Sequence, residues 1–244
     1  MRFFMLSDLH LGKGVSVARA KEQLETLCSK IRTIYSPKET VLFVIMGDII
    51  NASDTAAFAD ARVCLDCIKK ELSSFDVHFE FVPGNHDLPA GDIEPFDRFV
   101  AEYGASCPFG GTAAFSKIYD DVNFIFADSN LARDHRLPGK IDIDAIRGEV
   151  KNKVNLLFCH HGFTHSFGGD HDVIENGSVI LAELNNMGIQ FAIHGHTHRA
   201  DATIQQNGIA EIGCGTLFKD VSDMGGIPNQ FSVGYINAGQ LVRI

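Results

Sequence analysis

Short apolar runs, each followed by polar residues, recur along the chain. They are rich in Val, Ile, Leu and Phe and are bounded by Gly, Pro or Asp, which is typical of buried strands. These runs occupy residues 2–6, 41–46, 78–82, 154–158 and 190–193. We predict a buried β-strand at each of them.

The segments between these runs have the periodicity of amphipathic helices. Apolar residues recur there at the i, i+3, i+4, i+7 spacing. The stripes predict helices over residues 20–34, 58–72, 96–103, 143–150 and 173–184. We expect these stripes to face the core, and we assign them no chemistry.

Two further regions have the pattern of β-hairpins. Strands are predicted at residues 112–118 and 122–127, and again at 201–205, 209–213, 231–237 and 241–244. Asn207-Gly208 and Ala238-Gly239 separate the later strands, and Asn-Gly between apolar runs is a strong hairpin signal. Alternating strands and helices with added hairpins predict an α/β fold, layered as two packed sheets in a single domain over residues 1–244.

The polar patches at the strand ends carry the candidate chemistry. They read Asp8-Leu9-His10, Gly47-Asp48-Ile49-Ile50-Asn51, Gly84-Asn85-His86-Asp87, His160-His161-Gly162 and Gly195-His196-Thr197-His198. Together they supply about seven potential ligands, namely carboxylate, amide and imidazole groups. This is too many for one ion and suits two divalent ions. A pair of metal ions is a device for attacking phosphate esters.

Each patch alone also has a plain structural interpretation. Gly-Asp after an apolar strand is usually a turn, and Asp-x-His is common by chance. However, all five patches fall at the carboxyl ends of predicted strands, where ligand sites gather in open α/β sheets. A shared metal centre explains this coincidence better than five unrelated turns.

Taken in order, these motifs resemble those of the calcineurin-like metallophosphoesterase superfamily. The resemblance spans residues 8–198 and implies a four-layer αββα sandwich of two mixed β-sheets flanked by helices, with a dinuclear centre. It implies that Asp48 bridges the two ions. It assigns the first metal to Asp8, His10 and His198, and the second to Asn85, His160 and His196.

The resemblance also gives His86 and Asp87 roles in catalysis. His86 would stay off the metals and act as a general acid for the leaving alkoxide, or as a donor to a phosphate oxygen. Asp87 would support it, either by orienting the His86 imidazole or by capping the next turn. The ions would lower the pKa of bound water and supply a hydroxide that attacks phosphorus.

The chain departs from its relatives at several positions. Many relatives have Asp where this chain has Asn51, and some have an Arg just after the Gly-Asp motif, whereas the nearest here are Arg32 and Arg62. The lack of this Arg disfavours a protein phosphatase of the calcineurin type. His-His-Pro, common among cyclic-nucleotide and glycerophosphodiester enzymes, is His160-His161-Gly162 here.

The favoured substrate is a small phosphodiester, either nucleotide-like or glycerol-like. The alternatives are a nuclease of the DNA-repair branch, a phosphomonoesterase and, less favoured, a non-catalytic scaffold. A formal net charge of −10 argues against a large nucleic-acid-binding surface. The ligand set suits Mn, Fe, Zn, Co or Ni, and leaves the metal and the oligomeric state open.

The remaining polar residues have competing interpretations. His161 and His194 adjoin ligands, and we expect mainly structural roles for them, as for Cys64-x-x-Cys67 on a predicted helix. His165 and His171 belong to a Gly-rich loop that either closes over substrate or is a solvated connector, and the basic stretch 133–136 is interpreted as a surface loop. Met1-Arg2 leads straight into the first strand and no apolar run is long enough to span a membrane, so we expect a cytoplasmic protein with reduced thiols.

Overall fold

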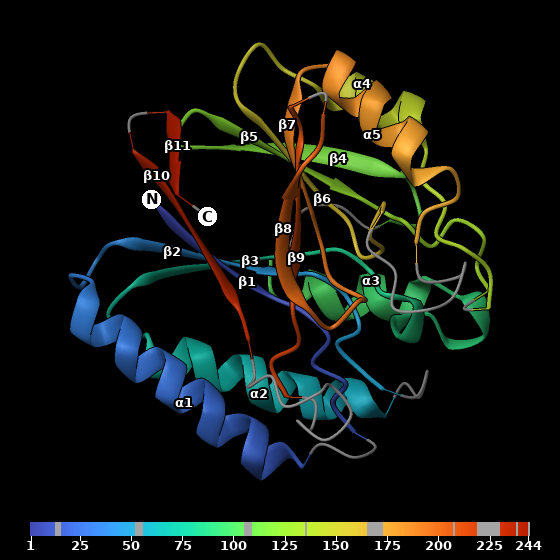
Figure 1. Ribbon diagram of the computed structural model, residues 1–244. Helices are drawn as coiled ribbons and strands as arrows, with labels where there is room; N and C mark the ends of the chain where they lie inside the picture. The colour runs from blue at the N-terminus through green and yellow to red at the C-terminus, as the bar shows by residue number, and fades with distance from the viewer. Residues whose placement is uncertain are drawn as a thin grey trace.

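Two β-sheets form the centre of the molecule, and helices cover their outer faces (Figure 1). The computed structural model describes residues 1–12, 16–51, 56–104, 109–134, 136–164, 173–206, 208–218, 230–237 and 239–243. Within these residues, the first sheet has five strands and the second has six. Both sheets mix parallel and antiparallel pairs. The predicted sandwich of two mixed sheets flanked by helices is therefore confirmed.

The order of the strands places the predicted metal-binding motifs at neighbouring strand ends. In sheet order, the first sheet contains β11 (Gln240–Arg243), β10 (Ser232–Asn237), β1 (Arg2–Leu6), β2 (Thr40–Ile45) and β3 (Asp76–Phe81). The second contains β4 (Ala114–Tyr119), β5 (Val122–Ala127), β6 (Asn155–Phe158), β7 (Ile189–His194), β9 (Ala210–Cys214) and β8 (Ala200–Ile204). β1, β2 and β3 are parallel, and so are β5, β6, β7 and β9.

Helices form the two outer layers. Those beside the first sheet are α1 (Val17–Ile34), α2 (Ala57–Glu71) and α3 (Glu94–Ala101), and those beside the second are α4 (Ile143–Glu149) and α5 (Gly177–Asn186) (Figure 1). The Ser16 hydroxyl caps α1 by accepting a hydrogen bond from Arg19 N–H, and Asp142 caps α4 through Ala145 N–H.

Aromatic side chains fill the space between the two sheets. Phe3 of β1 lies edge-on to Phe124 of β5, with ring centroids 5.0 Å apart, and also meets Phe158 of β6. Phe124 and Phe158 are themselves stacked at 5.1 Å. All three are fully buried, so burial of this large apolar surface joins the sheets face to face.

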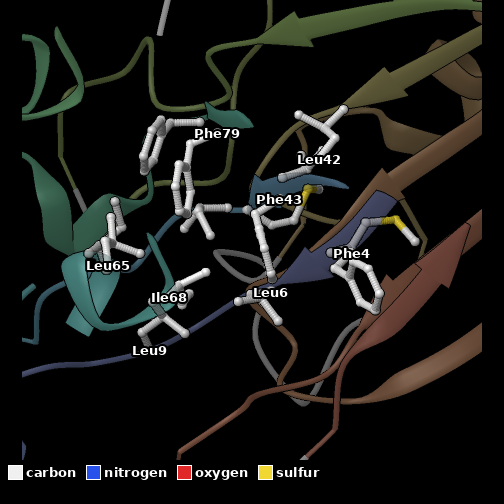
Figure 2. Close-up of a cluster of buried hydrophobic side chains, with 14 of the residues drawn as sticks. Phe4, Leu6, Leu9, Leu42, Phe43, Leu65, Ile68 and Phe79 are labelled. Atoms are coloured by element: carbon white, nitrogen blue, oxygen red, sulfur yellow. The ribbon is translucent and has the colours of Figure 1, made fainter. Parts of the chain in front are cut away.

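The opposite face of the first sheet packs against helices. Phe4, Phe43 and Phe79 are directly paired in register across β1, β2 and β3, and their rings are stacked 5.4 and 5.5 Å apart. Figure 2 shows this row of rings with Leu65 and Ile68 of α2 in the same cluster. The row fixes the relative positions of the three strands whose ends carry candidate ligands.

The predicted hairpins are present, but one predicted helix begins too early. β4–β5, β8–β9 and β10–β11 are antiparallel pairs, although Asn207 and Ala238 of the turns lie outside the described residues. The helix expected from residue 173 begins at Gly177. Val173 and Ile174 instead make β-bridges to Gly162 and Gly139, which local periodicity does not reveal.

Candidate metal centre

The candidate ligands follow strands that are neighbours in the two sheets. The residues and the strands that precede them are Asp8 and His10 (β1), Asp48 (β2), Asn85 (β3), His160 (β6), and His196 and His198 (β7). Because the carboxyl ends of parallel strands meet at one edge, loops far apart in sequence converge there. The structure brings all seven side chains together.

Asp8, His10 and His198 form the first group of potential ligands. His10 Nε2 and His198 Nε2 are 3.0 Å apart, and Asp8 Oδ1 lies 3.2 Å from the latter and 3.8 Å from the former. Asp8 and His10 are buried, and His198 is partly buried. The three atoms therefore enclose one position at the edge of the core.

His160 is at the middle of the second group. Its Nε2 lies 3.0 Å from Asn85 Oδ1, 3.1 Å from His196 Nδ1 and 3.5 Å from Asp48 Oδ1. Its Nδ1 lies 2.8 Å from the carbonyl oxygen of Met46. A carbonyl only accepts, so His160 Nδ1–H donates and Nε2 is directed at the other potential ligands.

Asp48 lies between the two groups. Its Oδ1 faces His160 Nε2 of the second group, and its Oδ2 is 3.8 Å from His10 Nε2 of the first. One carboxylate thus presents one oxygen to each group, which is the position that a bridging ligand requires. The His86 N–H donates to Asp48 Oδ1 at 2.9 Å and holds the carboxylate in place.

The donor set fits two divalent cations. Carboxylate oxygens, an amide oxygen and ring nitrogens converge on each position, and all of them can offer lone pairs to a metal. Asp8 Oδ1 is buried and has no hydrogen-bond partner among the described residues. It lies 3.2 Å from His198 Nε2, so this oxygen and that ring nitrogen offer lone pairs to the same position.

The backbone around the ligands adopts a conformation that L-residues avoid. Five of the seven candidates have positive φ angles: Asp8 (53°), His10 (44°), Asp48 (51°), His196 (62°) and His198 (54°). Each such residue costs about 1–2 kcal/mol. Strain of this kind persists where surrounding structure imposes it, as at ligand sites, and here it turns the side chains toward one another.

Two glycines in the motifs are required by close approach. A Cβ on Gly84 would lie 2.1 Å from the backbone nitrogen of Asp48 and 2.2 Å from its Oδ1. A Cβ on Gly195 would lie 1.8 Å from Ser7 Oγ. The glycines therefore let the loops after β2, β3 and β7 pack directly on the two buried carboxylates.

Opposite charges stabilise the metal-free centre. Burial alone would raise the pKa of both carboxyls, but nearby imidazoles overcome this effect and hold the pKa of Asp8 and of Asp48 below the usual range. Burial would lower the pKa of His160, but Asp48 raises it to about 9. Burial lowers the pKa of His10 to about 4. At neutral pH, His160 therefore carries a proton that a metal would replace.

His86 lies at the rim of this centre. Its Nδ1 is 2.8 Å from the carbonyl oxygen of Asn51, so the ring is oriented by that backbone group. Its Nε2 is 3.9 Å from Asp48 Oδ2, and the side chain is 37% exposed. His10, Asp48 and His86 also satisfy the spacing of a ligand group, so geometry alone permits both metal binding and contact with substrate.

Asp87 acts on the backbone of two ligand loops. Its carboxylate accepts hydrogen bonds from the N–H groups of Ile49 (2.8 Å), Ile50 (3.1 Å) and Gly84 (2.9 Å). Burial and the charge of Asp48 raise the pKa of Asp87 to about 7, against the effect of these donors. The bond from Gly84 caps the turn Asn85–Asp87, which fits the capping alternative better than orientation of the His86 ring, and the bonds from Ile49 and Ile50 join the loop after β2 to the loop after β3.

His161 and Ser129 form a second buried pair beside the ligands. His161 is buried with its ring centroid 4.5 Å from that of His196, and burial together with the imidazoles of His196 and His160 holds its pKa well below the usual range. Ser129 Oγ lies 2.9 Å from His161 Nδ1. The sequence analysis missed Ser129, although it follows β5 and so shares the strand-end signal of the ligands.

A cavity of about 430 Å³ adjoins the centre. Asn85 and His161 line it, and so do Arg133 and Arg136 of the basic stretch noted in the sequence. Arg133 pairs with Asp128 at 2.8 Å and Arg136 with Asp134 at 2.8 Å. The basic stretch therefore borders a cavity at the metal centre, and its arginines are already paired with carboxylates.

The other noted residues take structural positions. His194 is buried, with Nε2 3.5 Å from Glu211 Oε1. Cys64 and Cys67 are buried on α2, and burial raises the pKa of the Cys64 thiol to about 12. Core packing is therefore the better interpretation of this cysteine pair. His135, His165, His171 and Cys107 lie outside the described residues.

Comparison with known protein families identifies the family that has this fold and site. The family described as "Calcineurin-like phosphoesterase" matches residues 1–200. The chain belongs to the calcineurin-like phosphoesterase family. It is therefore a metal-dependent phosphoesterase, and the His/Asp groups at the strand ends are candidate ligands for the dinuclear divalent-metal centre of this family.

Solved structures share its fold at low sequence identity. A dimetal phosphatase from Danio rerio has a TM-score of 0.65 and 15% identity, with coverage of 97% of this chain and 92% of that one. Phosphopantetheinyl hydrolase from Mycobacterium tuberculosis has a TM-score of 0.54 and 14% identity, with coverage of 88% and 89%. A putative 5'-nucleotidase from Staphylococcus aureus has a TM-score of 0.57 and 14% identity, with coverage of 99% and 54%.

Two further comparisons are negative. No curated protein sequence matches the chain significantly. Among the helices of the described residues, none combines the length and the apolar character needed to cross a membrane.

Proposed function

We propose that the protein hydrolyses a small phosphodiester, with a nucleotide-like or glycerol-like organic group, at a pair of divalent cations. The supporting observation is the position of Asp48, which directs one carboxylate oxygen to each of two groups of buried ligand atoms. In this proposal Asp8, His10 and His198 hold one cation and Asn85, His160 and His196 hold the other. Manganese is the first metal to test, because the mixed N and O ligands suit it.

The two cations would supply positive charge for the phosphate oxygens and would lower the pKa of bound water. The chain's own groups would provide orientation and proton transfer. The Met46 carbonyl fixes the His160 ring, and the Asp87 carboxylate fixes the loops that carry Asp48 and Asn85. A phosphate ester is therefore recognised by the centre, while the chain as a whole carries a formal charge of −10.

His86 is proposed as the general acid for the leaving group. Its Nδ1–H donates to the Asn51 carbonyl, so a proton exchanged with substrate would pass through Nε2. In the neutral ring this Nε2 is unprotonated, so His86 must enter the reaction as imidazolium to donate. Asp48 Oδ2, 3.9 Å from Nε2, would stabilise that charge.

A phosphomonoesterase is the second candidate, and a nuclease is the third. A dimetal phosphatase and a 5'-nucleotidase have similar folds, but their identities of 15% and 14% carry no substrate over to this chain. The net charge of −10 opposes a long polyanionic substrate. We also propose one domain over residues 1–244 and a cytoplasmic location, which the free thiols of Cys28, Cys64, Cys67, Cys159 and Cys214 support.

The deciding experiment compares two chromogenic esters. The metal-free protein is loaded with Mn²⁺, and kcat/KM is measured for bis-p-nitrophenyl phosphate and p-nitrophenyl phosphate. The proposal predicts faster hydrolysis of the diester and none without added metal. Faster hydrolysis of the monoester would establish a phosphomonoesterase instead. If neither ester is hydrolysed but a single-stranded oligonucleotide is cleaved, the protein is a nuclease and the proposal is wrong.

A further inference from the structure

The hydroxyl of Ser129 fixes the tautomer of His161. Ser129 Oγ accepts hydrogen bonds from the backbone N–H of His160 at 3.2 Å and of His161 at 3.0 Å. These two donors fill the two lone pairs of the hydroxyl oxygen. Its own hydrogen must then go to the third neighbour, His161 Nδ1, 2.9 Å away. In the neutral ring, the proton therefore resides on Nε2.

The side chain that carries this Nε2–H lines the cavity beside the candidate metal centre. His161 is only 3% exposed, yet no described residue accepts a hydrogen bond from its Nε2. The side chain lines the cavity that Asn85 also lines, and its ring lies 4.5 Å from that of His196. The imidazole therefore presents a donor to the cavity, beside two proposed ligands of one cation.

The position of the ring is tightly constrained. A Cβ on Gly139 would lie 2.7 Å from His161 Cβ and Cγ, so the backbone packs closely against one side of the ring. Ser129 holds both the backbone and Nδ1 of His161. Because the ring is fixed, the acceptor for Nε2–H must come from the cavity, where water occupies the position until a ligand replaces it.

We propose that His161 Nε2–H donates a hydrogen bond to a phosphate oxygen of the substrate, with Ser129 as the positioning residue that fixes the donating tautomer. This inference rests on the proposed function, because it concerns the ester bound at the same centre. It makes His161 a catalytic residue that binds the phosphate group, and not a structural histidine. The hydrogen bond to a charged oxygen adds affinity without contributing a metal ligand.

Two substitutions separate substrate binding from structural support. His161→Gln places an amide N–H near the position of imidazole Nε2 and loses the Ser129 contact. His161→Asn places an amide oxygen near the position of Nδ1, keeps the Ser129 contact and loses the donor to the cavity. Both variants introduce an amide side chain. If His161 binds substrate, His161→Asn should bind phosphate more weakly than His161→Gln; if His161 only supports the structure, the order of the two affinities should be reversed.

Inorganic phosphate is the binding probe. Its Kd for the Mn²⁺-loaded proteins is measured by isothermal titration calorimetry, with metal content measured on the same samples. His161→Asn should weaken phosphate binding by about 10- to 100-fold, and His161→Gln should stay within about threefold of wild type. Both should retain the wild-type metal content. If His161→Asn binds phosphate as well as or better than His161→Gln, or if the wild type binds none, the proposal is overturned.

A spectroscopic measurement covers the case in which a variant fails to fold. In the Zn²⁺-loaded wild type, ¹⁵N–¹H correlation of the histidine rings should show His161 protonated at Nε2 and not at Nδ1. Its Nε2–H resonance should shift on addition of phosphate. Protonation at Nδ1, or a resonance that phosphate leaves unchanged, contradicts the proposal. A wild type that binds phosphate through His161 but hydrolyses no ester would refute the proposed function while leaving this inference standing.

Discussion

Asp48 Oδ1 lies 3.5 Å from His160 Nε2, and this pair holds a proton at the position of one proposed cation. Although burial opposes the charged ring, Asp48 raises the pKa of His160 to about 9. A metal must meet a neutral imidazole, so binding has to displace that proton. Metal binding and proton release are therefore coupled at His160 Nε2.

Metal binding should therefore release protons at neutral pH. His160 is protonated in the metal-free protein at all pH values below about 9, so about one proton should leave from this ring at pH 7.5. The release should fade as pH rises through 9. Calorimetric titration with Mn²⁺ in buffers of different ionisation enthalpy measures it. A proton count near zero at pH 7.5 would show that His160 is not displaced by the metal.

The raised pKa of His160 also predicts how the free energy of unfolding changes with pH. A histidine whose folded pKa exceeds its ordinary value of 6.5 stabilises the metal-free fold fully below that value. The stabilisation is lost as pH rises from 6.5 to about 9. His160→Gln should remove this part of the pH dependence of the free energy of unfolding in chelator. An unchanged profile would contradict the assignment.

Gly84→Ala should damage both stability and metal binding. The new Cβ would lie 2.1 Å from Asp48 N, so the loop after β3 must move away from the loop after β2. We expect a loss of about 1–3 kcal/mol in the free energy of unfolding and weaker metal binding. Denaturant unfolding and metal analysis measure the two effects.

Gly148→Ala is the matched control for this substitution. A Cβ on Gly148 would meet no atom within 4 Å, and the residue lies in α4. Alanine is the better helix former, so this variant should be as stable as wild type or more stable. If both alanine variants behave alike, close packing at Asp48 does not explain the Gly84 result.

His86→Ala should slow hydrolysis without removing metal. The loss in kcat should be about 10²- to 10⁴-fold for a diester with a poor leaving group and smaller for p-nitrophenolate, which needs no proton. The control is His78→Ala, since His78 pairs only with Asp76 at the surface among the described contacts. Loss of a metal ion from His86→Ala would instead make His86 a ligand, which its spacing from His10 and Asp48 permits.

Asp87→Ala should loosen the centre through the backbone. It leaves the N–H groups of Ile49, Ile50 and Gly84 without their acceptor, and each unpaired buried donor costs about 1–3 kcal/mol. We expect a lower melting temperature and weaker metal binding. At saturating Mn²⁺, the ratio of rates for good and poor leaving groups should match that of wild type. A changed ratio would mean that Asp87 acts on His86 after all.

The sequence predicted the layers and the convergence of the candidate ligands because both depend on local signals at the strands and their ends. Apolar strands followed by short polar motifs indicate which strand ends carry chemistry. Parallel pairing of β1 and β2 places Asp8 beside Asp48, and the packing of the two sheets brings His160 to them. The fold class followed from alternating periods of strand and helix. These features need no knowledge of which loops touch.

Features that depend on contacts between distant loops were not predictable. Val173 and Ile174 have helical spacing, but their partners are Gly162 and Gly139. A serine after β5 is unremarkable in sequence, and the importance of Ser129 comes from His160 and His161 in another loop. The carboxylate of Asp87 likewise binds backbone groups that no side-chain pattern identifies.

The number of divalent ions per chain tests the central claim most directly. Metal-free protein is titrated with Mn²⁺, and bound metal is measured by inductively coupled plasma mass spectrometry in wild type and Asp48→Ala. We predict two ions per wild-type chain, with spin coupling visible by electron paramagnetic resonance. Asp48→Ala should lose the coupled pair and more than about 10³-fold in turnover. A single ion in the wild type, or a coupled pair that survives in Asp48→Ala, would contradict a centre bridged by this carboxylate.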